Sequence, residues 1–155
     1  MSEQMSPISS IPPDIYERVH ELAVAIVNAS EVGDDRLDDS LCQTLRVYFD
    51  EQASSGRSRP FLTEAMADYT CDAVEAVRLY ELALEQTRAF PDEPTHTKMI
   101  SLAQRLIELG RGEQAEAYLR DGRAEAVRRD DTFWIEDANR LLRQLGSGNR
   151  LSDER

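Results

Sequence analysis

The chain has 155 residues, which is enough for a single domain that buries about 70% of its unfolded surface without disulfides or metals. It carries 30 acidic and 18 basic residues, and the formal charge of −12 repels nucleic acid and anionic lipid, because both bind through Lys and Arg. The same charge attracts a basic protein partner, although solubility alone would also account for it.

Two further features restrict where the protein works. No apolar run is long enough to cross a membrane, and residues 1–13 are polar and rich in Ser and Pro, unlike a signal peptide. Cys42 and Cys71 lie beside apolar residues and match no metal-type spacing, so we expect buried free thiols and not a disulfide. The sequence therefore predicts a cytoplasmic protein.

The first third of the chain reads as a flexible leader over residues 1–12 followed by a helical hairpin over 13–55. Pro12 and Pro13 begin the first helix, Gly33 ends it, and Asp34 and Asp35 begin the second. Apolar residues recur at helical spacing in both helices. These residues are Ile15, Val19, Leu22, Ala23, Ile26 and Val27, then Leu37, Leu41, Leu45, Tyr48 and Phe49.

Residues 61–90 contain neither Gly nor Pro and could form one helix or two. We predict a break near Cys71, because Asp72 followed by Glu75 has the pattern of a capping box. Further helices are expected from Thr95, which can cap the first of them, to Gly110, then from Gly112 onward, and from Asp131 to Gly146. A flexible tail over 147–155 would follow. The predicted fold is all-α, with about seven helices in one domain over residues 13–146.

The segment from Met99 to Gly122 resembles a tetratricopeptide repeat (TPR), a helical hairpin with small residues where its two helices cross and a Gly-containing turn. The matching positions are Met99, Leu102, Ala103, Leu106, Gly110, Ala115, Leu119 and Gly122. A weaker copy contains Ala76, Tyr80 and Ala83, and a half-copy contains Trp134, Ala138, Leu141 and Gly146. The resemblance covers residues 60–146 and implies antiparallel hairpins stacked as a short TPR-like solenoid.

In this family the first helices of successive repeats line a groove that binds peptides or helices. Carried over by position, the resemblance implies partner-binding roles for Gln104, Glu108, Glu136 and Asn139, and also for Asp68 and Tyr69 of the weaker copy. The alternative is that these are ordinary exposed residues of amphipathic helices. Trp134 matches a core position of the family, but it could also anchor an interface.

Nothing in the sequence identifies catalytic or cofactor chemistry. His20 has no second His four residues on, so there is no zinc-protease motif, and His96 is expected to face solvent or cap a helix. The acidic run at 34–39 lacks the spacing and central Gly of a calcium loop. No nucleophile is spaced with a base and an orienting acid. We therefore predict a protein that is not an enzyme, with no catalytic residues, no metal site and no cofactor.

Size, acidity and the TPR-like groove together predict a protein-binding module. The first hypothesis is a bacterial immunity protein that neutralises a basic toxin, and the second is a secretion chaperone or adaptor that holds a segment of a secreted protein. A small-molecule or peptide sensor is the third. In none of these three hypotheses does the protein bind nucleic acid or a membrane.

Overall fold

The computed structural model describes residues 11–153, with the backbone alone described for 149–153. These residues form seven helices: α1 (Pro13–Glu31), α2 (Asp35–Ser54), α3 (Pro60–Asp68), α4 (Ala73–Gln86), α5 (His96–Glu108), α6 (Gly112–Arg128) and α7 (Thr132–Asp153). No strand occurs among them, so the predicted all-α fold is confirmed. Most of the predicted leader, residues 1–10, lies outside the described part of the chain.

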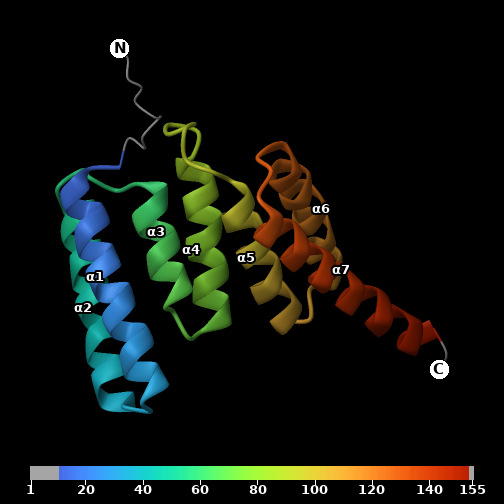
Figure 1. The fold of residues 1–155 in the computed structure, drawn as a ribbon, viewed down its shortest axis with the longest axis horizontal. Helices are drawn as coiled ribbons and strands as arrows, with labels where there is room; N and C mark the ends of the chain where they lie inside the picture. Colours follow the sequence, from blue (N-terminus) through green and yellow to red (C-terminus); the bar gives the residue numbers. More distant parts are fainter. Residues whose placement is uncertain (1–10, 154–155) are drawn as a thin grey trace.

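The helices pack as successive antiparallel hairpins, α1–α2, α3–α4 and α5–α6, with α7 against the last one. Figure 1 shows these units following one another along the long axis of the molecule, and each contacts its neighbours. Buried apolar side chains from all seven helices form one core cluster. Stacked hairpins thus share a continuous core, which is how short helical repeats gain stability.

Local signals set the helix ends much as the sequence predicts. Gly110 adopts φ 75° after α5, its N–H bonds to Ile107 O, and the Arg111 N–H bonds to Leu106 O at 2.8 Å. This is a Schellman motif, which a residue with a side chain adopts only at a cost. Asp72 caps α4 by accepting a hydrogen bond from the Val74 N–H at 3.0 Å, so residues 61–90 form two helices.

One predicted helix end is wrong, and one predicted capping hydrogen bond is absent. The helix predicted to end at Gly146 continues as α7 to Asp153, because neither Gly146 nor Gly148 takes the left-handed conformation that would end it. Residues 147–153 of the predicted tail are therefore helical, residues 154–155 lie outside the described range, and the flexibility of this segment stays a prediction. Thr95 precedes α5 but makes no capping hydrogen bond through its side chain, because its backbone is already helical.

Several predicted core positions are exposed. In α2 only Leu45 is fully buried, while Leu37 is 46% exposed, because α2 lies at one end of the stack and has neighbours on one side only. Cys71 is also exposed, since the chain is in the turn between α3 and α4 there. Conversely, Ile100 is completely buried although it is not among the positions that match the repeat pattern.

Gly122 explains how closely α5 and α6 approach. A Cβ at this position would lie 2.9 Å from Ile100 Cγ1 and 3.2 Å from Met99 Cβ. Because real Cβ atoms do not come this close to other carbons, a larger residue would push the helices apart. The small residue of the TPR-like pattern therefore has a direct packing role here.

We expect Gly122→Ala to lower the free energy of unfolding by about 1–2 kcal/mol, since overpacking outweighs the higher helix propensity of alanine. Gly146→Ala is the matched control, because a Cβ on Gly146 would meet nothing within 4 Å. That variant should gain about 0.5–1 kcal/mol. Urea unfolding measures both, and a stabilised Gly122→Ala would contradict the close helix contact.

Among the described residues, no helix combines the length and the apolar character needed to cross a lipid bilayer.

Candidate binding groove

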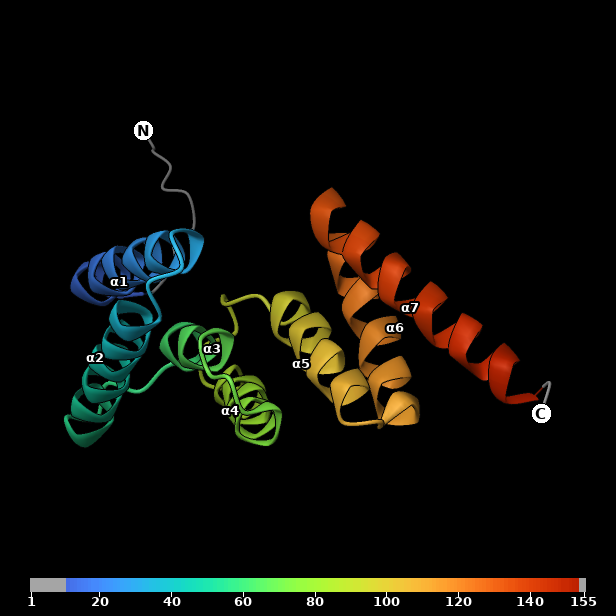
Figure 2. The same ribbon diagram turned by 90° about the horizontal axis from the view of Figure 1, so that it is seen from below.

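The first helices of the three hairpins, α1, α3 and α5, border the inner side of the curve that the chain describes, whereas α2 and α4 lie on its outer side (Figure 2). We call the side bordered by α1, α3 and α5 the inner face. Three hollows lie along it, and Asp68 at the end of α3 lines all three. The three hollows of the inner face therefore adjoin one another at the carboxylate of Asp68.

The first of the three hollows, which we call the polar hollow, lies between α3 and α5 and has a volume of about 370 Å³. Its lining residues are Asp68, Tyr80, Ser101, Gln104, Arg105 and Glu108. Three residues that the sequence places in the groove, Asp68, Gln104 and Glu108, thus come together, although 36 and 40 positions separate Asp68 from the other two along the sequence. Gln104 and Glu108 are exposed, so both side chains are accessible to a partner.

The junction hollow lies where α1 and α2 meet the turn between α3 and α4, and it has a volume of about 300 Å³. Ile26 and Val27 supply apolar walls, while Tyr69, Cys42 and Cys71 line the same space. Tyr69 also reaches the hollow between α1 and α3, so this predicted groove residue lies on the inner face as well. The N-terminal hairpin, for which the sequence shows no repeat pattern, therefore contributes to these hollows.

Asp68 has unusual electrostatics for a residue that is exposed to solvent overall. The pKa of its carboxyl is raised to about 7, chiefly because burial among protein atoms disfavours the charged form and also because Glu64 lies nearby. A hydrogen bond of 2.6 Å from the Tyr80 hydroxyl and the positive charges of Lys98 and Arg105 act in the opposite direction. At neutral pH this carboxyl is divided between its neutral and charged forms.

Arg105 lines both the polar hollow and the junction hollow, and it was not identified from the sequence. Its Nη2 donates to the carbonyl of Thr70 at 2.7 Å, and its Nη1 contacts Glu108 Oε1 at 3.2 Å. The side chain thereby ties α5 to the turn after α3 and fixes Glu108 in the hollow. No sequence signal distinguishes Arg105 from the other arginines, because its role depends on which turn packs against α5.

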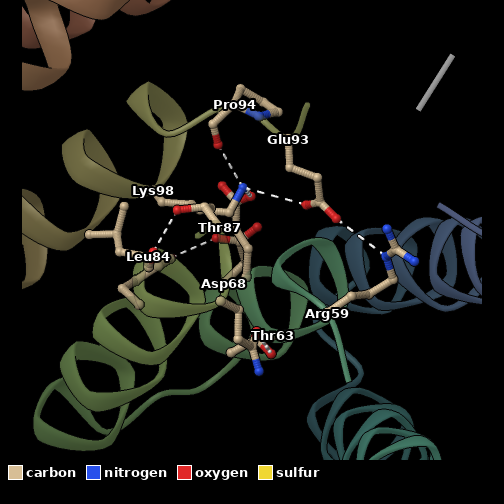
Figure 3. Close-up of polar contacts among 11 residues, drawn as sticks. Arg59, Thr63, Asp68, Leu84, Thr87, Glu93, Pro94 and Lys98 are labelled. Carbon is tan, nitrogen blue, oxygen red and sulfur yellow. Dashed lines mark hydrogen bonds and ion pairs between the residues drawn. The ribbon is translucent and has the colours of Figure 1, made fainter. Parts of the chain in front are cut away.

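The only lysine of the chain, Lys98, is buried behind the inner face, with 1% of its side chain exposed. Its Nζ lies 2.9 Å from Glu64 Oε1 on α3 and 3.8 Å from Glu93 Oε1, and it donates to the carbonyl of Pro94 at 2.8 Å (Figure 3). Lys98 therefore joins α5 to α3 and to the loop that precedes α5.

Arg59 completes this buried ion cluster. Its Nε lies 3.3 Å from Glu93 Oε2, and its guanidinium lies over the Phe90 ring at 4.3 Å from the ring centroid. Burial raises the pKa of Glu93, while the positive charges of Lys98 and Arg59 lower it. The cluster thus pairs two cations with two carboxylates, Glu64 and Glu93, and fixes the spacing of α3 and α5.

The predicted residues of α7 lie outside the three hollows. Glu136 is exposed, whereas Asn139 accepts a hydrogen bond from Arg123 Nε at 2.6 Å and so connects α6 with α7. Trp134 is half-buried against the core. The structure therefore does not bring Glu136, Asn139 and Trp134 together with Asp68, Gln104 and Glu108 in one hollow.

The expectation that His96 faces solvent or caps a helix is wrong, since only 3% of the residue is exposed. Its Nε2 lies 2.8 Å from Asp131 Oδ2, and the Trp134 ring meets its edge at 6.4 Å between centroids. The first residue of α5 packs against the turn before α7 and against the start of α7, a contact that sequence spacing does not reveal. His96 thus joins the last two units of the stack.

The surroundings of Cys42 are not those of a nucleophile. Partial burial and the hydrogen bond to Asp38 raise the pKa of the Cys42 thiol to about 11, so it stays protonated at neutral pH. In the part of the chain that the structure describes, no group of three or more His, Cys, Asp or Glu side chains could hold a metal ion.

Comparisons with known proteins return no match, either among family models, among curated proteins or among solved structures.

We expect Lys98→Met to lower the free energy of unfolding by about 3 kcal/mol, because it leaves Glu64 and Glu93 without their shared cation in the interior. Arg120→Met is the control, since the exposed pair of Arg120 with Glu116 should contribute less than about 0.5 kcal/mol. Denaturant unfolding measures both. Equal, small losses would show that the cluster does not hold α3 and α5 together.

Asp68→Asn should raise the melting temperature by about 2–4 °C at pH 8 and have little effect at about pH 4. The unfolded carboxyl releases its proton near pH 4 and the folded one only near pH 7, so the wild-type protein loses stability as pH rises between these values. Asn keeps an acceptor for the Tyr80 hydroxyl but cannot ionise. Calorimetry at both pH values measures the effect, and a difference independent of pH would contradict it.

Proposed function

We propose that the protein is a non-catalytic module that holds another protein on its inner face, in the manner of a TPR-like groove. The observation that carries the proposal is the joining of three hollows at Asp68, with side chains contributed by the first helices of three successive hairpins. A ligand lying along such a surface contacts α1, α3 and α5 at once, which suits a protein segment better than a small molecule.

Charge supports a basic partner. The chain has a formal charge of −12, and Asp68, Glu108 and Glu64 lie on the inner face or border it. Complementary charge speeds the encounter of two proteins and excludes partners of the same sign. The partner that fits this surface presents Arg or Lys side chains.

Among proteins of this kind, an immunity protein that neutralises a basic toxin in the bacterial cytoplasm is our first choice. The buried ion cluster fixes the helices that form the inner face, so this surface is already ordered before a partner binds. Binding to it then costs little conformational entropy. A secretion chaperone or adaptor is the alternative, because an extended segment of a secreted protein could also lie across α1, α3 and α5. A sensor for a peptide or small molecule would use one hollow only.

We expect Gln104→Arg combined with Glu108→Arg to weaken partner binding at least tenfold, because two cations would replace neutral and acidic groups in the polar hollow. Glu85→Arg on the outer helix α4 is the matched control, since Glu85 is exposed and lies away from the inner face. The partner is captured from cells of the source organism, identified by mass spectrometry, and titrated against each variant by calorimetry.

A growth assay then separates the candidate functions. If the captured protein is toxic when expressed alone and harmless with the wild-type chain, the immunity role is supported. Capture of a non-toxic secreted protein favours the chaperone role. Equal affinity of the double variant and the control would place the interface off the inner face and contradict the proposal.

A further inference from the structure

A row of aromatic rings lies between α1 and α3. The Tyr16 ring stacks on Phe61 with 5.7 Å between centroids and an interplanar angle of 24°, and it is parallel to the His20 ring at 6.2 Å. Tyr16 remains 52% exposed, so these contacts leave much of the residue open to solvent. An exposed tyrosine held in place by stacking is a ready platform for a flat or cationic group.

These rings border the third hollow of the inner face, which we call the aromatic hollow and which has a volume of about 270 Å³. Its apolar walls are formed by Val19, Ala23 and Ala65, and its polar residues include Glu64 and Asp68. The hollow thus combines an apolar wall, aromatic rings and carboxylates. That combination suits a long side chain with an aliphatic stem and a positive end.

The two carboxylates are not equally available. Glu64 already pairs with buried Lys98 at 2.9 Å. Asp68 accepts the Tyr80 hydroxyl on Oδ1 only, and its Oδ2 accepts no hydrogen bond from the residues that the structure describes. Asp68 is therefore the carboxylate that an incoming cation can use.

At two other places in the molecule a cation contacts both an aromatic ring and a carboxylate, and in both places it is an arginine. Arg59 lies over the Phe90 ring beside Glu93, and Arg46 lies over the Phe49 ring at 5.8 Å while contacting Glu75 at 3.7 Å. In both places a guanidinium combines an aromatic face with a carboxylate. Guanidinium groups are suited to this because they are planar, weakly hydrated and form directed hydrogen bonds.

We propose that the aromatic hollow binds an arginine side chain of the partner protein, with its guanidinium against Tyr16 and its hydrogen bonds directed to Asp68. This inference rests on the proposed function and makes it more specific. It gives the N-terminal hairpin a direct role in recognition through α1, next to the polar hollow between α3 and α5.

The probe is the capped tripeptide Ac-Gly-Arg-Gly-NH2, titrated into the isotope-labelled full chain and followed by NMR. The citrulline tripeptide, which has the same shape without the charge, and the lysine tripeptide are the comparisons. We expect the arginine peptide to shift the resonances of Tyr16, His20 and Tyr69, the lysine peptide to bind more weakly, and the citrulline peptide to leave these resonances in place.

Variants locate the binding. Tyr16→Phe keeps an aromatic face and should bind the arginine peptide as the wild type does, whereas Tyr16→Leu keeps only apolar area and should bind about two- to fivefold more weakly. Phe133→Leu is the control, because Phe133 is an exposed aromatic residue on α7, far along the stack. Thermal unfolding of each variant checks that the fold is kept.

Three results would overturn the inference: shifts centred away from the aromatic hollow, equal binding of the citrulline or lysine peptide, or an unchanged affinity in Tyr16→Leu. None of these would affect the proposed function, because that is tested with the captured partner and with variants of the polar hollow. Loss of partner binding in the polar-hollow variants together with a failed arginine titration would remove this inference alone.

Discussion

The arrangement of the inner face depends on Lys98, a buried cation between two hairpins. Taking an ammonium group out of water costs several kcal/mol, and only closely placed partners offset that cost. Lys98 meets this requirement with Glu64, Glu93 and the carbonyl of Pro94, which come from α3 and from the loop before α5. Because these partners must all be in place together, the cluster selects one register of α3 against α5, and Asp68 and Gln104 face the same hollow as a result.

The residues that hold the hairpins together are different from those that are exposed for contact with a partner. Arg59, Lys98 and Glu93 are withdrawn from solvent and hold the hairpins, whereas Gln104, Glu108 and Tyr16 are exposed and free to meet a partner. Asp68 lies between the two groups. The pKa of Asp68 is raised because its carboxyl is partly removed from water without a directly bonded cation. A cation contributed by a partner would stabilise the charged form of this carboxyl. Groups left in such a state are frequent at functional sites.

The sequence predicted what depends on local pattern. Helical periodicity, the glycine at Gly110 and the aspartate at Asp72 identified the helices and most of their ends, and the small residue at Gly122 lies at a close helix crossing as its place in the repeat pattern implied. Asp68, Gln104 and Glu108, which the resemblance to TPR proteins singled out, line one hollow, whereas their role in binding and the family itself stay predictions. What could not be predicted depends on tertiary partners. From sequence alone Lys98 would be expected on the surface, and only the fold places Glu64 and Glu93 beside it. The same holds for His96 against Asp131 and for the part that α1 takes in the inner face.

The central claim is that a protein partner lies across α1, α3 and α5. Amide hydrogen exchange of the complex, compared with the free chain, tests this most directly because it locates protection without any substitution. The account predicts slowed exchange at the Asp68 end of α3, in the turn that follows it and along the exposed parts of α1 and α5. Slowed exchange confined to α2, α4 and α6, with α3 and α5 unchanged, would contradict it.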